Sequence, residues 1–265
     1  MVCCAADHTQ AQELKEYLGD ESILYSETKQ VNQFFRRFNG EEDPEGRRLY
    51  QADDLYHGSS LRFFYLSMLF DQSSATLSAG DKDRFIQQMI ADEQYLSFLG
   101  GDWVAEVNCT FTYQGVPRTV LLFLVLERAT VGSKWVFKDL YFGPYKRRFI
   151  PRQSEADLPF IHPLSHELDF MNLSKVFREP EQAALLTSSV YRPDYLTIFL
   201  YELAEGKFMF KHVNSVAFHF FQIDGWYFQL NDIQRQDPNR GWLITQLISV
   251  PDGQEQQVLD FIYRR

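Results

Sequence analysis

The 265-residue chain is acidic and aromatic, with a net charge of −10, a hydrophobic fraction of 45%, 24 Phe and 14 Tyr. Such a chain can bury one large core or two modest ones, which excludes disorder over most of its length. Residues 1–150 carry 16 basic and 21 acidic side chains and residues 151–265 carry 10 and 15, so both parts repel a phosphate backbone and nucleic acid is excluded as the main partner.

The first residues bear on location. Residues 2–6 contain two adjacent cysteines and are compatible with the remnant of a lipoprotein signal, in which a cysteine becomes the lipidated N-terminus. We therefore favour the periplasm or cell envelope over the cytoplasm, with this lipid as the contact with a membrane. The longest apolar run, residues 120–126, is too short to span a bilayer. Cys109 on a predicted apolar face and the adjacent Cys3 and Cys4 give no disulfide framework.

Helices are expected in the first hundred residues. Residues 9–18 suit either a short helix or a mobile leader. A helix capped by Ser26 runs to Phe38 and has a stripe directed at a core, formed by Val31, Phe34, Phe35 and Phe38. Two more helices are predicted over residues 61–70 and 81–99. Between Phe38 and the helix over 61–70, residues 41–58 hold six carboxylates whose spacing does not match a calcium loop, and we predict a solvated loop: Glu41, Glu42, Asp43, Glu45, Asp53 and Asp54.

Three segments between Asp102 and Tyr145 have the patterns of strands. In residues 103–113 the odd positions are apolar and alternate with Glu106, Asn108 and two threonines, which is the pattern of a half-buried strand. Residues 119–126 are apolar throughout, as in a central strand, although periodicity alone also allows a short buried helix. Short connections with Gly115 and Gly132 lead to a third strand, so we predict an antiparallel meander.

The order of helices and strands is repeated in the second half. Pro144, Pro151 and Pro159 mark a connector, and we predict domains of residues 1–150 and 151–265. A basic cluster in this connector is interpreted as a solvated linker: Lys146, Arg147, Arg148 and Arg152. Beyond it we predict a helix from Ser165, a helix over 195–203, strands over 211–223, 226–235 and 242–250, and a last helix over 254–263. The turn Asp224-Gly225 is a hairpin signal.

Helices followed by a three-stranded meander, twice in one chain, resemble the element order of cystatin-like and nuclear transport factor 2-like proteins. The resemblance covers residues 26–145 and 165–250. It implies an α+β fold of two tandem modules, each with helices packed on a curved antiparallel sheet. In that family the sheet forms a cone that can hold a ligand, and some members are isomerases or dehydratases with a carboxylate or His opposite a Tyr. The segments NQFFRRFNGEED and GWLITQLI also resemble a group of uncharacterised gut Bacteroidetes proteins, which implies no activity.

The resemblance makes the polar side chains that interrupt the strands the candidates for ligand binding: Glu106, Asn108, Asp139, Tyr141, His219, Tyr227 and Gln229. None is predicted to be catalytic. We expect Glu106 and Asp139 to face solvent. We expect His219 to be a core histidine bonded to the backbone.

One pair of histidines has a spacing that can suit a metal site. His162 and His166 are four residues apart, but Pro163 lies between them and no third ligand is fixed by the sequence. The sequence therefore predicts no metal site and no cofactor.

These observations favour a non-enzymatic binding or scaffold protein of a bacterial cell envelope, with a protein or a glycan as its partner. The aromatic fraction of 16% and the lack of a convergent polar constellation support this prediction. One alternative is a small-molecule enzyme or carrier that uses the cone of one module. Another is an assembly component of a secretion or conjugation apparatus, because such machines use a similar fold. The oligomeric state is not indicated.

Overall fold

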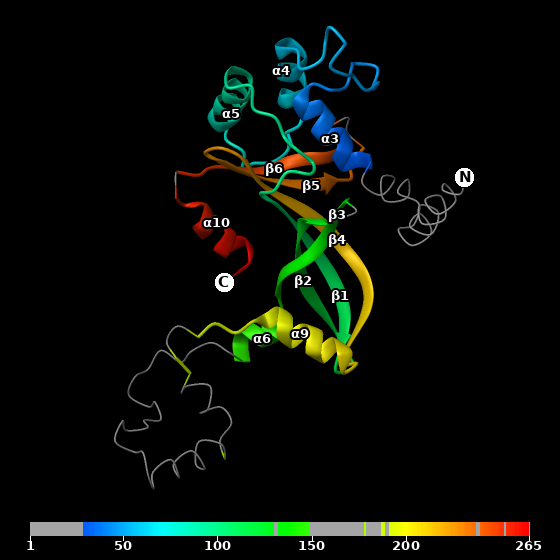
Figure 1. Ribbon diagram of the computed structural model, residues 1–265, viewed down its shortest axis with the longest axis vertical. Coiled ribbons are helices and arrows are strands. Elements are labelled where there is room, and N and C mark those ends of the chain that lie inside the picture. Colours follow the sequence, from blue (N-terminus) through cyan, green and yellow to red (C-terminus); the bar gives the residue numbers. More distant parts are fainter. Residues whose placement is uncertain are drawn as a thin grey trace, which may run out of the picture. The chain divides into compact units, whose positions relative to one another are not determined.

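The fold combines helices with one antiparallel sheet (Figure 1). This computed structural model describes residues 29–129, 132–148, 178, 187–188, 191–236, 239–251 and 253–264. The elements in chain order are α3 (Lys29–Asn39), α4 (Ser59–Met68), α5 (Ala79–Ala91), β1 (Trp103–Tyr113), β2 (Val116–Ala129), β3 (Gly132–Tyr141), α6 (Gly143–Arg148), α9 (Tyr195–Ala204), β4 (Phe208–Ile223), β5 (Trp226–Ile233), β6 (Gly241–Ser249) and α10 (Glu255–Ile262). The predicted α+β class is confirmed. Within the described ranges, no helix has the length and apolar character needed to cross a bilayer.

The six strands lie in one sheet in the order β3-β2-β1-β4-β5-β6. Both predicted meanders are present, and their first strands, β1 and β4, are neighbours at the centre of the sheet. The turn between β4 and β5 is the predicted Asp224-Gly225 pair, in which Gly225 has a φ of +76°. Because the two meanders share a sheet, the prediction of two tandem modules is not confirmed.

The chain forms two compact units. Unit 1 consists of Met1–Glu106, Val125–Val136 and Val216–Phe261, and unit 2 of Val107–Leu124, Phe137–Ser215 and Ile262–Arg265. Strands β1 to β4 contribute residues to both units. Each unit combines segments from both sides of residue 150, and the predicted domain boundary there stays a prediction.

The core of unit 1 is built on the aromatic stripe of α3. The predicted stripe residues are all at most 5% exposed: Val31, Phe34, Phe35 and Phe38. The ring of Phe38 stacks on that of Phe228 in β5, with centroids 6.2 Å apart. Gly40, at a φ of +72°, follows Asn39, the last residue of the helix, and ends it. In Figure 1, α3, α4 and α5 lie together on one side of β5 and β6.

Unit 2 has its own core, where α9 packs on β1, β2 and β3. The buried residues of this core are Cys109, Phe111, Val120, Leu122, Leu140, Phe142, Tyr145, Phe199 and Phe208. Asp194 caps α9 by accepting hydrogen bonds from the main-chain N–H groups of Leu196 and Thr197. Cys109 is a free thiol, and burial raises its pKa. It behaves as a small apolar side chain, as expected.

The prediction of a fully solvated loop over residues 41–58 is wrong for Glu42 and Asp43. Both are buried, and Glu42 has no exposed side-chain surface. Its carboxylate accepts hydrogen bonds from the side chains of Gln33, Arg36 and Arg37 on α3. A buried carboxylate needs such donors, so the two arginines explain why this acidic residue is tolerated inside.

Other predicted boundaries differ. Helix α5 ends at Ala91 and not at residue 99, because Asp92 caps it and Glu93 has a φ of +49°, which a helix cannot continue. The predicted linker forms the short helix α6, in which Lys146 donates a hydrogen bond to the main-chain oxygen of Arg264. Arg152, the segment 9–18 and the helix predicted from Ser165 lie outside the described residues.

Candidate functional site

Three of the candidate polar residues meet in unit 1. Because β1, β4 and β5 are adjacent in the sheet, Glu106, His219 and Tyr227 lie on neighbouring strands. His219 Nδ1 lies 2.9 Å from Tyr227 Oη, and His219 Nε2 lies 3.3 Å from Glu106 Oε2. We call this group the triad. The expectation that His219 bonds to the backbone is wrong, because both of its ring nitrogens contact side chains. The expectation that Glu106 faces solvent holds only in part, because its side chain is 19% exposed and one carboxylate oxygen contacts His219.

The triad is buried at its Tyr227 end and partly exposed to solvent at its Glu106 end. His219 and Tyr227 are each 3% exposed, whereas the side chain of Glu106 is 19% exposed. A neutral imidazole satisfies both contacts when Nε2–H donates to the carboxylate and Nδ1 accepts from the phenol. Burial and the nearby Glu106 carboxylate raise the pKa of Tyr227, so the phenol stays protonated at neutral pH. The triad is therefore a proton-bearing chain from a buried phenol to a partly exposed carboxylate.

Gln229 follows Tyr227 on the same face of β5 but forms a separate group. Its side-chain amide donates to Asn231 Oδ1 at 3.0 Å, and the same oxygen accepts from Thr245 Oγ1 at 2.7 Å. This contact orients Gln229 along the strand, away from a direct bond to the triad.

The remaining candidates lie in unit 2. Asn108 Oδ1 accepts a hydrogen bond from Asn214 Nδ2 at 2.7 Å. Asp139 is 8% exposed and accepts from the main-chain N–H of the next residue, so the expectation that it is solvated is wrong. Tyr141 lies under the guanidinium of Arg264, 5.2 Å from its ring centroid. The contacts described for these three residues do not join them to one another.

Helix α4 exposes an apolar stripe that the sequence interpretation did not single out. Phe63, Phe64 and Met68 are 56%, 53% and 46% exposed. With the exposed Ser60 and Ser67 they recur at the i, i+3, i+4, i+7, i+8 spacing of one helix face. We call these five residues the α4 stripe. It contains no charged residue, and the only sequence signal for it is that the helix is apolar on both faces.

The inward face of α4 is anchored by Arg62, which is 2% exposed. Its guanidinium donates to the main-chain oxygens of Phe38 at 3.3 Å, of Met89 at 3.1 Å and of Gln94. It also lies 4.3 Å from the ring centroid of Tyr95. Burial lowers the pKa of Arg62. Arg62 was not among the residues predicted to have a role, although a single charge inside an apolar helix was the available signal.

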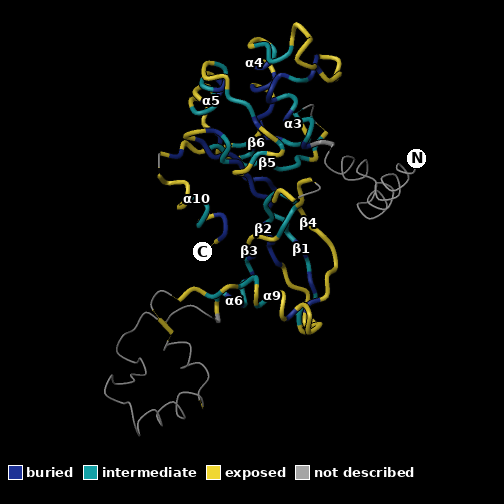
Figure 2. The backbone as a smooth tube through the Cα atoms, viewed as in Figure 1, coloured by how far each residue is buried: buried dark blue, intermediate teal, exposed yellow. Residues whose placement is uncertain are grey.

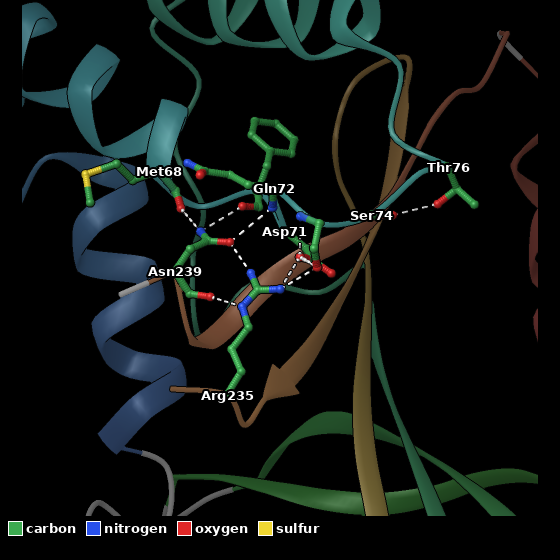
Figure 3. Close-up of polar contacts among 9 residues, drawn as sticks. Met68, Asp71, Gln72, Ser74, Thr76, Arg235 and Asn239 are labelled. Atoms are coloured by element: carbon green, nitrogen blue, oxygen red, sulfur yellow. Dashed lines mark hydrogen bonds and ion pairs between the residues drawn. The ribbon is translucent and has the colours of Figure 1, made fainter. Parts of the chain in front are cut away.

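A polar clasp holds the C-terminal end of α4 (Figure 3). Asn239 Nδ2 donates to the main-chain oxygens of Met68 at 3.1 Å and Phe70 at 3.0 Å. Arg235 donates to the carboxylate of Asp71 at 2.9 Å and to the main-chain oxygen of Asn239 at 2.6 Å. The segment that follows α4 is thereby tied to the connection between β5 and β6. With Arg62 on one side and the clasp at one end, the α4 stripe is presented on a fixed helix.

A second histidine stands out by its backbone. His57 has a φ of +59°, which costs energy for a residue other than glycine. Its ring is stacked between those of Tyr56 and Tyr95, at centroid distances of 3.8 and 4.1 Å, and Nε2 lies 3.4 Å from Glu41 Oε1. The stacking between the two tyrosine rings stabilises the positive φ of His57. Nothing in the sequence predicts this backbone conformation.

No family model, no curated protein and no solved structure matches this chain. Among the residues that the structure describes, no group of three or more His, Cys, Asp or Glu side chains is placed to hold a metal ion. His162 and His166 lie outside those residues.

Proposed function

We propose that this chain is a non-enzymatic binding or scaffold protein of a bacterial cell envelope, and that the α4 stripe docks a protein partner. The observation that carries the proposal is the pair of half-exposed rings of Phe63 and Phe64 on a helix whose opposite face is anchored. Single exposed apolar side chains are common, but aromatic and Met side chains grouped on one uncharged face are typical of binding surfaces. Because the helix is fixed, docking orders few additional groups.

The composition of the α4 stripe favours a protein over a glycan. Its polar atoms are two serine hydroxyls, and that of Ser67 already donates to the main-chain oxygen of Phe63 at 2.8 Å. A glycan would leave many of its hydroxyls without partners on such a surface. Met68 has a flexible thioether that adapts to irregular apolar surfaces. An apolar helix or groove of a partner protein matches this stripe, because helices pack through the same i, i+3, i+4 spacing.

The test uses an envelope fraction as the source of partners and the purified partner for measurement. A partner of the wild-type protein should bind the double variant Phe63→Ser/Phe64→Ser at least about tenfold more weakly, since each aromatic anchor contributes roughly 1 kcal/mol or more. The control is Phe261→Ser, which removes an 81% exposed ring from α10. The proposal is refuted if the double variant binds as tightly as this control.

A second candidate function is favoured by the triad. A phenol, an imidazole and a carboxylate in series can pass a proton between buried Tyr227 and partly exposed Glu106, as an acid–base enzyme or a carrier of an ionisable small molecule requires. Such a function needs access to the imidazole. The exchange rate of the His219 Nε2 proton, measured by nuclear magnetic resonance, tests this. A ring proton protected for hours would rule the function out.

We also propose that the two meanders derive from one duplicated cystatin-like or nuclear transport factor 2-like module. The strand order supports this, since β2 and β3 follow β1 to one edge while β5 and β6 follow β4 to the other. A duplication predicts that β1–β3 and β4–β6 superpose with corresponding registers in an experimental structure. Unrelated registers would contradict it.

A further inference from the structure

The first half of β4 forms an open sheet edge. Strand β5 pairs with β4 from Ala217 to Ile223, so among the described residues the stretch 208–216 has β1 as its single neighbouring strand. Residues 209–215 are exposed without interruption, and Met209, Phe210 and Val213 are 54%, 56% and 48% exposed. Figure 2 shows this exposed stretch along β4. We call residues 209–215 the β4 edge.

The backbone of the β4 edge is suited to pairing. A strand with one neighbour directs the N–H and C=O groups of alternate residues away from the sheet, where another extended chain can bond to them. Natural edges are commonly protected by proline or by several charges. The β4 edge has no proline and a single charged residue, Lys211. Its β-branched and aromatic side chains, Val213 and Phe210, favour cross-strand packing.

The opposite side of the β4 edge is held in place by β1. The ring of Phe210 contacts that of Phe111 edge-on, with centroids 5.5 Å apart. Asn214 donates to Asn108 at 2.7 Å and accepts from Thr110 Oγ1 at 3.1 Å. These contacts fix the strand in an extended conformation, so an incoming strand meets a preformed edge.

Charge selects the occupant. The exposed Lys211 has no ion-pair partner among the described residues and lies beside the exposed His212. The β4 edge contains no carboxylate, although the whole chain has a net charge of −10. In an antiparallel pair centred on the β4 edge, a second copy would bring the Lys211 residues of both chains to neighbouring positions, and this repulsion opposes association. We propose that the β4 edge binds an extended acidic segment of another protein as an added strand, with a carboxylate beside Lys211 and apolar side chains beside Met209 and Val213.

The experiment uses the full chain and a fluorescein-labelled peptide of sequence Thr-Val-Glu-Val-Thr-Val-Glu-Val, with a version carrying Lys in place of Glu. The acidic peptide is expected to bind and to slow amide hydrogen exchange in residues 209–215. Lys211→Glu should weaken the acidic peptide about tenfold and strengthen the Lys peptide. Lys138→Glu, the same charge change at another exposed strand residue, should leave both unchanged.

Three results would overturn the proposal. The first is unchanged exchange in residues 209–215 with peptide present, and the second is equal binding of the two peptides. The third is protection of residues 209–215 that grows with protein concentration in the absence of peptide, which would identify a second copy as the occupant. Phe63→Ser/Phe64→Ser is expected to bind the peptide normally, so failure of the α4 stripe and failure of the β4 edge are distinguishable.

Discussion

Replacing Arg62 by methionine tests whether this buried arginine holds the helices of unit 1 together. Methionine keeps the apolar stem and removes the guanidinium. The three main-chain oxygens of Phe38, Met89 and Gln94 then lose their donor. Those of Phe38 and Met89 belong to the last turns of α3 and α5, where no further helical N–H is available to replace it.

The expected loss follows from these contacts. Each buried oxygen without a partner costs about 1–3 kcal/mol, and the contact with Tyr95 adds roughly 0.5–2 kcal/mol. Part of this is offset because the charged guanidinium no longer has to be buried, which is the effect that lowers the pKa of Arg62. We therefore expect Arg62→Met to lower the free energy of unfolding by about 3 kcal/mol, a large share of the roughly 5–15 kcal/mol of a typical protein.

Urea unfolding followed by circular dichroism measures this loss, with the midpoint shifting at constant m-value. Arg48→Met is the matched control, because Arg48 is exposed and its guanidinium lies over the ring of Tyr50, 5.2 Å from the centroid, with no hydrogen bond or ion pair described for its side chain. The control should change the free energy of unfolding by no more than about 0.5 kcal/mol. If Arg62→Met lies within about 1 kcal/mol of the control, the three oxygens are not held by this arginine and the reasoning fails.

Three further predictions concern stability. Because the pKa of Tyr227 is raised in the folded protein, the buried phenol contributes stability that is fully present below the unfolded pKa of about 10 and is lost progressively above it. Tyr227→Phe should therefore reduce the slope of the free energy of unfolding against alkaline pH by about 1.4 kcal/mol per pH unit, measured by urea unfolding. Parallel slopes for the two proteins would contradict this. Gly40→Ala should lower the free energy of unfolding by about 2 kcal/mol or more, because the alanine Cβ would lie 2.6 Å from Arg62 Cγ at a φ of +72°. Gly46→Ala is the control, since its Cβ would lie in open space at a φ of +82°, and it should cost about 1 kcal/mol. Equal losses in thermal unfolding would exclude the contact with Arg62. Asp194→Ala should lower the free energy of unfolding by about 1 kcal/mol at pH 7, because α9 loses its cap. Hydrogen bonds from Thr197 lower the pKa of Asp194, so the difference in stability between wild type and variant should shrink as the pH falls below about 4. A difference independent of pH would count against the cap.

Local features of the fold could be predicted because they depend on neighbours in the sequence. The stripe from Val31 to Phe38 repeats with the period of a helix, and the alternation from Trp103 onward repeats with the period of a strand. The Asp224-Gly225 turn needs a backbone that glycine adopts freely, and Gly225 has that backbone. Each of these signals lies within about a dozen residues, the range over which periodicity is informative.

The triad and the buried loop carboxylate could not be predicted in the same way. Glu106 and His219 are 113 residues apart, and they meet only because β4 lies beside β1. Periodicity does not state which strands are neighbours. For Glu42, the acidic composition of the loop favoured solvent, but Arg36 and Arg37 on the preceding helix supply the donors that compensate burial. The composition of a segment indicates whether its side chains favour solvent, but burial of one carboxylate also depends on the donors that surround it.

The turn between β5 and β6 links the two proposed binding features. Strand β5 ends at Ile233, so it is half as long as β4, with 8 residues against 16. An added residue of strand advances about 3.3 Å, so β5 covers only part of β4 and the rest stays an edge. The residues that follow β5, Arg235 and Asn239, form the clasp that holds α4. A turn placed later in the chain would lengthen β5 along β4, cover the β4 edge and remove the clasp from α4. The position of this one turn therefore sets both the open edge and the fixed α4 stripe.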